Sequence, residues 1–413
     1  MMTKPDSNDK MDYYYLVILL FSIVFVPYIP LSSSFNLSVE EPLLLYPLIR
    51  LLLRKEFKKD RFSLILLAFS AYIVFTIFLN GHTGQLNEYF EILKIIKFLL
   101  VYQFAVSVFR NQETEKRLIK TVDILFVVSF AINLFHFFDF FNFTRSVLIY
   151  YDPNSIDIDF YGLNSKGYPA AKRILGTLGN PNDNAIFFLF FLSFYIGRIN
   201  FALKRFFSFE LFGFIGSGLL IFLTQSRTGI FVMLVFLLVY LIYNKAHLIK
   251  SLFSIALLSF FIVLPGLFNQ TSTNYIQNTS VEITENNSVR GRLEIWKQLI
   301  GEWKEKPVFG YGPNKAYMYT HNIYPENEYI FFLWRFGIIG LLFFMAVIFF
   351  PVWNLKWDIF KYKFVLLVVL AIAVTALTNI PFSNMKFLII IALIFGYSAE
   401  KKEKSDLEQY YTK

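Results

Sequence analysis

Long apolar stretches recur along almost the whole chain, separated by polar connections. A helix needs about 20 mainly apolar residues to cross the hydrocarbon core of a bilayer, and about twelve stretches approach that length. Charged residues make up only 17% of the 413 residues, whereas a soluble domain carries about 25%. The 52 phenylalanines exceed what one water-soluble core can bury. The sequence therefore predicts an all-α integral membrane protein.

The apolar stretches divide the chain into membrane-spanning blocks and loops. We predict five spans within residues 1–138, four within residues 185–268 and three within residues 329–398. Two long loops, 139–184 and 269–328, separate these blocks, and residues 399–413 form a tail. The predicted spans are 13–31, 37–53, 62–79, 92–109, 118–138, 185–196, 206–224, 228–243, 252–268, 329–350, 364–377 and 381–397.

Basic residues alternate between the connections in a way that orients the helices. Segment 54–61 contains five lysines and arginines and segment 110–120 contains four, whereas connections 32–36 and 80–91 contain none. Because cytoplasmic loops carry an excess of Lys and Arg, we predict that both termini lie in the cytoplasm and both long loops outside. No small-residue cleavage site follows the first apolar stretch, so we interpret it as a retained helix rather than a signal peptide.

The composition excludes several classes of site. The chain has no cysteine, which excludes disulfides, thiolate metal sites and cysteine nucleophiles. Its four histidines are too few to suggest a multi-histidine metal centre. We attribute the net charge of +9 to cytoplasmic loops rather than to a nucleic-acid partner. The external loops contain no acidic cluster with metal-ligand spacing, so we expect no metal and no other cofactor.

The end of the first long loop carries a polar motif, AKRILGTLGNPNDN, that leads directly into the sixth span. Gly, Asn and Pro favour an irregular backbone whose free N–H groups can face an anion at a helix start. The candidate ligand-binding side chains are those of Arg173, Asn180 and Asn182. Alternatively, the motif is only a turn that begins a helix, with the arginine reaching to the membrane surface.

A second motif, TQSRTG, forms the short connection between the seventh and eighth spans. Its Arg227 lies on the side that is otherwise depleted of basic residues, which is unfavourable for topology and suggests a function that compensates. The alternative is a simple anchor at the membrane interface.

The second long loop contains SVRGRLEIWKQLIGEW, in which apolar residues recur at helical spacing. We predict either a helix lying at the outer membrane boundary or a small cap packed on the bundle. Two basic residues, Arg290 and Arg292, diverge on such a helix, so we expect one of them to face a shared site. The apolar face comprises Trp296, Leu299, Ile300 and Trp303.

The fourth motif, YGPNKAYMYTHNIYPENEYIFFLWRFGIIG, precedes and enters the tenth span. A charge inside a membrane span is a functional candidate by default, although an arginine two turns from the outer end can also reach the surface. The candidate site residues here are Asn314, His321, Asn322, Glu326, Asn327, Glu328 and the intramembrane Arg335.

Several separated arginines on one face suit a diphosphate ligand. Arginine carries a permanent charge and a planar fork that matches phosphate oxygens. Enzymes without a metal neutralise a diphosphate leaving group with Arg or Lys. The motifs are therefore consistent with a reaction on a lipid diphosphate at the outer face, bound by Arg173, Arg227, Arg290 and Arg292.

In order and spacing, the pieces RILGTLGNPN, LTQSRTGI, RLEIW…PVFGYGPN and ENEYIFFLWRFGIIGLL resemble the O-antigen ligase and polymerase superfamily of bacterial membrane glycosyltransferases. The resemblance covers most of the chain. It implies a helical fold of the glycosyltransferase C type in the cytoplasmic (inner) membrane and a glycan donor linked to undecaprenyl diphosphate. It also implies that Arg173, Arg227 and Arg292 bind diphosphates in a metal-independent, inverting reaction. A chain-length regulator protein is an implied partner.

The resemblance favours the polymerase branch over the ligase branch. Ligases carry a His-Asn pair in which the Asn lies ten residues before the glycine of this span, and here Glu326 and Asn327 occupy those positions before Gly337. His321 and Asn322 lie five residues too early. The favoured function is thus polymerisation of lipid-linked repeat units into O-antigen, capsule or exopolysaccharide. Transfer of the glycan to lipid A-core remains the alternative.

On the polymerase interpretation, Glu326 or Glu328 is the candidate base for the acceptor hydroxyl, with His321 as a rival. These acids can instead simply cap a helix, since carboxylates favour a helix N-terminus. A flippase for the same lipid-linked sugar is the alternative from another class. The lack of an internal repeat and the placement of the motifs on one face argue against transport.

Overall fold

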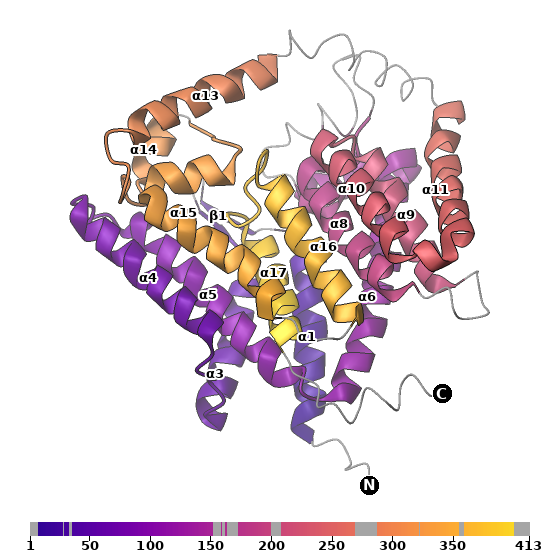
Figure 1. Cartoon of the computed structure of the whole chain (residues 1–413), viewed down its shortest axis with the longest axis horizontal. Helices are drawn as coiled ribbons and strands as arrows, with labels where there is room; N and C mark the ends of the chain where they lie inside the picture. The colour runs from indigo at the N-terminus through magenta and orange to yellow at the C-terminus, as the bar shows by residue number, and fades with distance from the viewer. Residues whose placement is uncertain are drawn as a thin grey trace.

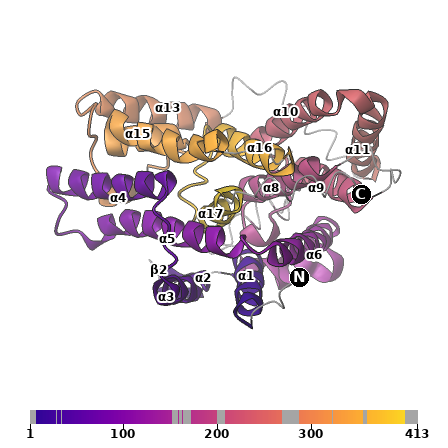
Figure 2. The ribbon, with the colours of Figure 1, turned by 60° about the horizontal axis from the view of Figure 1, so that its bottom comes forward.

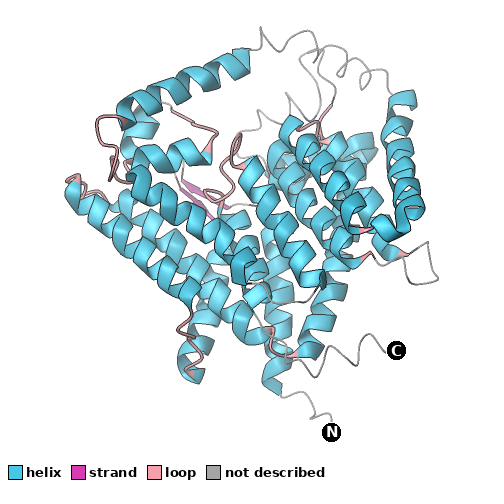
Figure 3. Ribbon diagram, in the orientation of Figure 1, coloured by secondary structure: helices cyan, strands magenta, loops and turns pink. Residues whose placement is uncertain are grey.

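The computed structural model of the chain describes residues 7–27, 29–32, 35–151, 158, 162, 172–199, 208–268, 287–321, 323–354 and 359–399. Within these ranges helices form nearly the whole structure, and the only strands are those of one short hairpin (Figure 3). The prediction of an all-α architecture is confirmed apart from this hairpin.

The elements follow the order that the apolar stretches predict. The N-terminal half contains α1 (Ser7–Phe25), β1 (Ile29–Ser32), β2 (Phe35–Leu37), α2 (Glu40–Leu43), α3 (Leu45–Arg54), α4 (Arg61–Leu79), α5 (Leu86–Val108), α6 (Gln112–Phe138) and α7 (Phe143–Ser146). The rest contains α8 (Pro181–Arg198), α9 (Phe209–Leu223), α10 (Arg227–Tyr243), α11 (Leu248–Phe268), α13 (Asn287–Trp303), α14 (Lys315–Thr320), α15 (Glu328–Asn354), α16 (Ile359–Thr375) and α17 (Met385–Ala399).

Length and apolar composition identify candidate membrane spans among these helices. In the described part of the chain, four segments qualify: Arg61–Leu79, Gln112–Phe138, Lys245–Val263 and Glu328–Trp353. The shorter helices α9, α10 and α17 are apolar as well. These helices fit an all-α membrane protein, and the count of twelve spans stays a prediction.

Short polar side chains fix where several helices begin. Asp60, Asn111, Ser208 and Ser226 precede α4, α6, α9 and α10 and accept hydrogen bonds from backbone N–H groups of the first turn. Such caps satisfy N–H groups that have no partner within the helix. These capping residues therefore determine where each helix begins, which apolar length alone does not.

One predicted span is not a single helix. Residues 37–53 complete the β1–β2 hairpin and continue as the short helices α2 and α3. Pro47 lacks the N–H that would bond to the Leu43 carbonyl, and its ring crowds that carbonyl, so the helix is interrupted here. The segment still follows the bundle, because Glu41 of α2 pairs with Lys97 of α5 at 2.6 Å.

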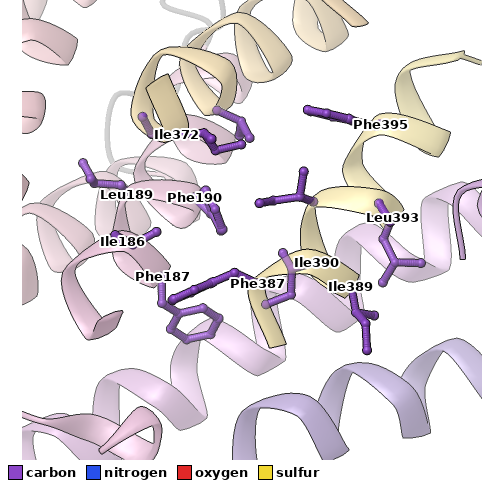
Figure 4. Packing of buried hydrophobic residues seen from close by; sticks show 14 of the residues in the cluster. Ile186, Phe187, Leu189, Phe190, Ile372, Phe387, Ile389, Ile390, Leu393 and Phe395 are labelled. Atoms are coloured by element: carbon purple, nitrogen blue, oxygen red, sulfur yellow. The ribbon is translucent and has the colours of Figure 1, made fainter. Parts of the chain in front are cut away.

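Two groups of helices flank α16 and α17 (Figures 1 and 2). One group contains α4, α5, α13 and α15, and the other contains α8, α9, α10 and α11. Helix α8 packs against α9 and α16, whereas α17 packs against α5. In the largest apolar cluster, Phe190 of α8 meets Phe387 of α17 edge to face, with ring centroids 6.0 Å apart (Figure 4).

The motifs gather at one end of the helices and the basic connections at the other. Where α4 ends, Asn80 Nδ2 donates to Gly310 O at 3.2 Å, and where α5 starts, Glu88 Oε1 accepts from Lys315 N at 2.9 Å. The basic segment 54–61 lies at the opposite end of α4 and ends at Arg61, the first residue of that helix. Helix α1 begins at the end of the molecule opposite α13 and α14 (Figure 1). Which end faces the cytoplasm stays a prediction.

Helix α15 is broken at Gly337, where φ is 63° and ψ is −166°. Segment 307–311 runs beside the break, and Ile338 N donates to Pro307 O at 2.9 Å. Essentially only glycine adopts this backbone conformation, and a Cβ at Gly337 would overlap the Val308 carbonyl. The backbone of residues 307–311, in the second predicted loop, therefore packs directly against the backbone of α15, the tenth predicted span.

Candidate functional site

The connection between α16 and α17, residues 376–384, lies where the motifs meet. At the start of α15, Glu328 N donates to Ala376 O at 2.8 Å, and Asn327 Nδ2 donates to Leu377 O at 3.0 Å. Asn327 also caps α15 by accepting a hydrogen bond from the backbone N–H three residues later. The end of the fourth motif is thus fixed against this connection.

The same connection contacts two further helix starts. Thr378 Oγ1 lies 2.6 Å from Thr228 Oγ1 in the first turn of α10. Asn384 Nδ2 donates to Asp183 Oδ2 in the first turn of α8 at 3.0 Å. The starts of α8, α10 and α15 therefore surround one connection. Our sequence analysis did not select this segment, although its polar run TNIPFSN was a usable signal.

Arg173 is held at the start of α8 by local contacts. Its Nε donates to Thr224 O at 2.8 Å, and its Nη2 donates to Asn182 Oδ1 at 3.1 Å. Asn180 caps α8, since its Oδ1 accepts from Asn182 N at 2.8 Å. The first motif thus joins the end of α9 to the start of α8, with its arginine half-buried between them.

Arg227 is the first residue of α10 and follows Ser226, whose hydroxyl accepts from Gly229 N at 3.3 Å. Gln225 has φ 53°, which turns the chain sharply between α9 and α10. The Arg227 side chain is exposed, and within the described ranges no hydrogen bond or ion pair engages it. Its guanidinium can therefore meet a ligand at the same end of the bundle as Arg173.

Arg292 of α13 forms an ion pair with Glu326, which lies two residues before α15. The Arg292 side chain is 29% exposed and the Glu326 side chain 45%. Arg290 instead pairs along the helix with Glu294 at 3.1 Å, and its side chain is 82% exposed. Only one arginine of this motif thus faces the start of α15.

Helix α13 belongs to a cap packed on the bundle, which we define as residues 287–321. Leu299 is fully buried with Trp334 of α15. Trp296 Nε1 donates to Pro325 O at 2.5 Å, which ties the helix to the segment before α15. Ile300 is exposed. Of the two predicted arrangements for this helix, the structure has the packed cap.

Glu302 accepts hydrogen bonds from two aromatic side chains, Tyr317 in the cap and Trp334 in α15. Its Oε2 accepts from Trp334 Nε1 at 2.7 Å and its Oε1 from the Tyr317 hydroxyl at 2.9 Å. Burial and the neighbouring Glu305 and Glu302 raise the pKa of Tyr311 to about 12, so its phenol stays protonated at neutral pH. The Tyr311 and Tyr317 rings both stack on Trp334. Sequence reasoning missed this cluster, because only the fold brings its aromatic residues together.

Among the described residues, His321 contacts Thr320 and Tyr317 and no arginine. It follows α14, its side chain is exposed, and its Nδ1 lies 2.9 Å from Tyr317 O. Asn322 lies outside the described residues. Asn314 is half-buried with φ 42°, at the turn that leads into α14. Neither His321 nor Asn314 contacts Arg173 or Arg227 in the part of the chain that the structure describes.

Arg335 is buried beneath the cap and contacts it through its Nε atom, whereas its buried Nη2 has no hydrogen-bond partner among the described residues. Its Nε donates to Pro313 O at 2.6 Å, and its Nη1 lies 3.2 Å from Glu91 of α5. Glu91 also pairs with Lys94 at 3.1 Å and with Lys315 at 3.0 Å. This network places the intramembrane arginine among protein groups rather than at an open surface.

The two candidate glutamates have opposite environments. Glu328 is completely buried, and its carboxylate accepts from Phe382 N at 2.9 Å and from Ser383 Oγ at 3.2 Å. Glu328 thus braces the α16–α17 connection. Glu326 is half-exposed and pairs with Arg292.

The residues that the structure describes contain no group of three or more His, Cys, Asp or Glu side chains that could hold a metal ion. The charged groups at or beside the starts of α8, α10 and α15 include Arg173, Asp183, Arg227, Glu326 and Glu328. The arrangement can bind an anion through arginines and helix starts and can offer a carboxylate to a hydroxyl group.

The O-antigen ligase family model matches residues 212–345, about a third of the chain. The match supports a place in the O-antigen polymerase and ligase superfamily. It runs from α9 into α15 and includes Arg227, Arg292 and Gly337, whereas the Arg173 motif precedes it. No curated protein matches the chain significantly. Similarity to this family implies a glycosyltransferase-like enzyme.

Proposed function

We propose that the protein polymerises oligosaccharide repeat units linked to undecaprenyl diphosphate, at the outer face of the bacterial cytoplasmic membrane. The main support is that the starts of α8, α10 and α15 surround residues 376–384, with Arg173, Arg227 and the Arg292–Glu326 pair beside them. The match to the O-antigen ligase family supports the same class of reaction.

The helix starts suit the diphosphate of the donor. The first turns of α8 and α10 carry the positive end of the helix dipole, although Asn180 and Ser226 already accept a hydrogen bond from one backbone N–H in each turn. Phosphates bind at such ends. Arg173 and Arg227 add two permanent charges there. The planar guanidinium of an arginine can donate two hydrogen bonds to two oxygens of one phosphate. We therefore assign these two arginines to the donor diphosphate and Arg292 to the neighbouring lipid substrate.

The proposed reaction is a displacement at the anomeric carbon of the donor sugar. The oxygen of an acceptor hydroxyl bonds to that carbon, and the bond from the carbon to the diphosphate oxygen breaks with inversion. The diphosphate leaves with the bonding electrons, and arginines stabilise its charge. The hydroxyl proton passes to a base, for which we propose Glu326 because Glu328 is enclosed and His321 contacts Tyr317 rather than an arginine. No metal or other cofactor takes part in this scheme.

We favour the polymerase over the ligase because of the residue beside Arg292. The resemblance gives ligases a histidine at the position of Glu326. Here His321, five residues before Glu326, contacts the Tyr317 backbone within the cap. A carboxylate paired with an arginine therefore stands where a ligase would present an imidazole.

Location and partners complete the proposal. We place both termini in the cytoplasm and the cap outside, which follows from the basic connections at the end of the bundle away from the cap. The substrates are two lipid-linked oligosaccharides in the bilayer. A chain-length regulator protein is the expected protein partner, and the product is O-antigen, capsule or exopolysaccharide.

The proposal is tested by deleting the gene in its host and separating the surface glycan and the lipid-linked intermediates on gels. A polymerase predicts surface glycan of a single repeat unit. Long chains that stay on undecaprenyl diphosphate would show a ligase instead. Single units trapped on the cytoplasmic side would show a flippase and contradict the proposal.

A further inference from the structure

A turn of the cap, residues 306–310, exposes two apolar side chains. Gly310 N donates to Lys306 O at 3.0 Å, which closes the turn. Between these residues, Val308 is 44% exposed and Phe309 is 37% exposed. Single exposed apolar residues are common on protein surfaces, whereas a contiguous exposed patch marks a surface that meets a membrane or another protein. The neighbours of this turn place it within such a patch.

The patch continues from the turn onto α4. The Phe309 ring meets the Phe75 ring edge to face, with ring centroids 5.4 Å apart. Phe75, Phe78 and Leu79, in the last turns of α4, are all exposed. This helix is a candidate membrane span, and its 19 residues measure about 28 Å, close to the hydrocarbon thickness of about 30 Å. Phe309 therefore lies at the depth of the last turns of a candidate span.

The patch also continues onto α15. Immediately after the break at Gly337, Ile338 N donates to Pro307 O at 2.9 Å. Ile338 and, one helical turn later, Leu342 are exposed. Like α4, α15 contains a candidate membrane span. The turn thus lies between two candidate spans, and its apolar side chains extend the exposed apolar faces of both.

The backbone of the turn is suited to contact with hydrocarbon. Hydrocarbon offers no hydrogen-bond partner, so irregular backbone at that depth must be paired with protein groups. Pro307 has no N–H, and its carbonyl is paired with α15. The Val308 carbonyl accepts from Ile339 N at 3.5 Å. The Gly310 carbonyl accepts from Asn80 Nδ2 at 3.2 Å. The turn can therefore meet lipid through its side chains while these carbonyls stay paired with the protein.

Polar and amphipathic side chains border the patch. Lys306 Nζ donates to Asn80 Oδ1 at 2.8 Å, directly after the end of α4. Trp303 Nε1 donates to Pro307 O at 3.0 Å, and Lys304 is exposed. Trp and Lys are typical of the boundary between hydrocarbon and water, where their apolar parts contact lipid and their polar ends reach water. Because Lys306 contacts Asn80, this boundary lies at the same level in α4 and in the cap.

We propose that the cap binds the bilayer by inserting Val308 and Phe309 into the hydrocarbon beside the end of α4. The partner is the lipid surface, and the contact is made by a turn between predicted spans rather than by a span. The continuous apolar patch of α4, the turn and α15 carries the inference, which does not depend on the reaction that the protein catalyses. Insertion fixes the height of the cap, and it thereby holds α13 with its Arg292–Glu326 pair near the lipid headgroups.

Labelling of single cysteines tests the insertion directly, because the chain has no cysteine of its own. The full-length Val308→Cys protein is labelled with the fluorophore NBD and placed in phosphatidylcholine vesicles. Leu67→Cys on the exposed face of α4 is the bilayer control, and Lys297→Cys on the exposed face of α13 is the water control. We expect iodide to quench the label at position 308 about fivefold less, or weaker still, than the label at position 297, because the hydrocarbon core excludes water and its ions. Lipids with a nitroxide near the top of the acyl chain should quench the label at position 308 strongly.

Two results would overturn the inference. If iodide quenches the labels at positions 308 and 297 equally and the nitroxide lipids quench neither, the turn lies in water. If neither quencher reaches the label at position 308, protein rather than lipid covers the turn. A disulfide-linked dimer of the Val308→Cys protein would then identify a second copy of the chain as the cover.

The wild-type protein gives an independent readout that does not depend on the folding of a variant. The probe is a phosphatidylcholine that carries a photoreactive diazirine near the top of its acyl chain, and mass spectrometry maps the adducts. We expect adducts on Val308 and Phe309 together with adducts on Phe78 of α4 and Leu342 of α15. Adducts on the two helices without any on the turn would contradict the proposal.

Discussion

Arg335 of α15 and Glu91 of α5 pair at 3.2 Å beneath the cap. The same arginine donates to the Pro313 carbonyl in the cap. A charge that sequence analysis marked as a candidate substrate contact is therefore placed to hold the cap on the bundle. Its role toward substrate stays a prediction, whereas its contacts give it an anchoring function.

The first prediction concerns this anchor. Arg335→Met should destabilise the protein, since removing one partner of a buried ion pair costs about 3–5 kcal/mol, and the cost is reduced here because Lys94 and Lys315 remain beside Glu91. The measurement is thermal unfolding together with limited proteolysis of the cap. Arg290→Met is the control, because Arg290 pairs only at the exposed surface. Equal protease resistance in the two variants would show that Arg335 does not hold the cap.

The second prediction concerns the break in α15. Gly337→Ala should destabilise the protein by roughly 3 kcal/mol or more, because the backbone conformation is essentially restricted to glycine and the Cβ would overlap a carbonyl. Gly301→Ala in α13 meets no atom within 4 Å and should be neutral or slightly stabilising. Unfolding temperatures of the two variants decide the matter. If the Gly337→Ala protein is as stable as the control, the backbone of residues 307–311 does not lie close to Gly337.

The third prediction concerns the arginines. Arg173→Ala, Arg227→Ala and Arg292→Ala should each lower polymer formation about 10²–10³-fold, the usual loss for one charge-stabilising contact. Arg292→Lys should also be impaired, because lysine lacks the planar fork. Polymer length in membranes with equal protein content is the readout, and Arg290→Ala is the control. Full activity in all three alanine variants would contradict the proposal that these arginines bind diphosphate.

The fourth prediction separates the two glutamates. Glu326→Gln should abolish polymer formation while leaving the unfolding temperature nearly unchanged, because this side chain is half-exposed. Glu328→Gln should instead lower the unfolding temperature, since the buried carboxylate accepts hydrogen bonds from the α16–α17 connection. His321→Ala should retain activity. An active Glu326→Gln and an inactive His321→Ala would assign the base to the histidine and favour the ligase.

Helix positions could be predicted from the sequence because apolar length and capping residues act locally. Ser226 before α10 and Asn180 before α8 mark helix starts that the structure retains. The interrupted second span shows the limit of apolar length as a signal, because Pro47 prevents one continuous helix. The break at Gly337 also escaped prediction, since it depends on a segment about 30 residues earlier in the chain.

The candidate site was predictable in its residues but not in its arrangement. The arginines could be selected because permanent charges are unusual at the depleted end of a membrane protein. The α16–α17 connection, around which the motifs lie, could not be predicted. It depends on contacts such as that of Thr228 with Thr378, which are 150 residues apart in the chain. The partner of Arg335 was hidden for the same reason, although the Glu91–Lys94 spacing on one helix face indicated a charged cluster.

The most direct test of the polymerase assignment is reconstitution. The purified protein in liposomes would receive a single repeat unit on undecaprenyl diphosphate, and mass spectrometry would follow the length of the lipid-linked glycan. We predict a ladder of products that grows by whole repeat units in the wild-type protein and is lost in Arg292→Ala. An unchanged single repeat, or transfer only after lipid A-core is added, would contradict the account.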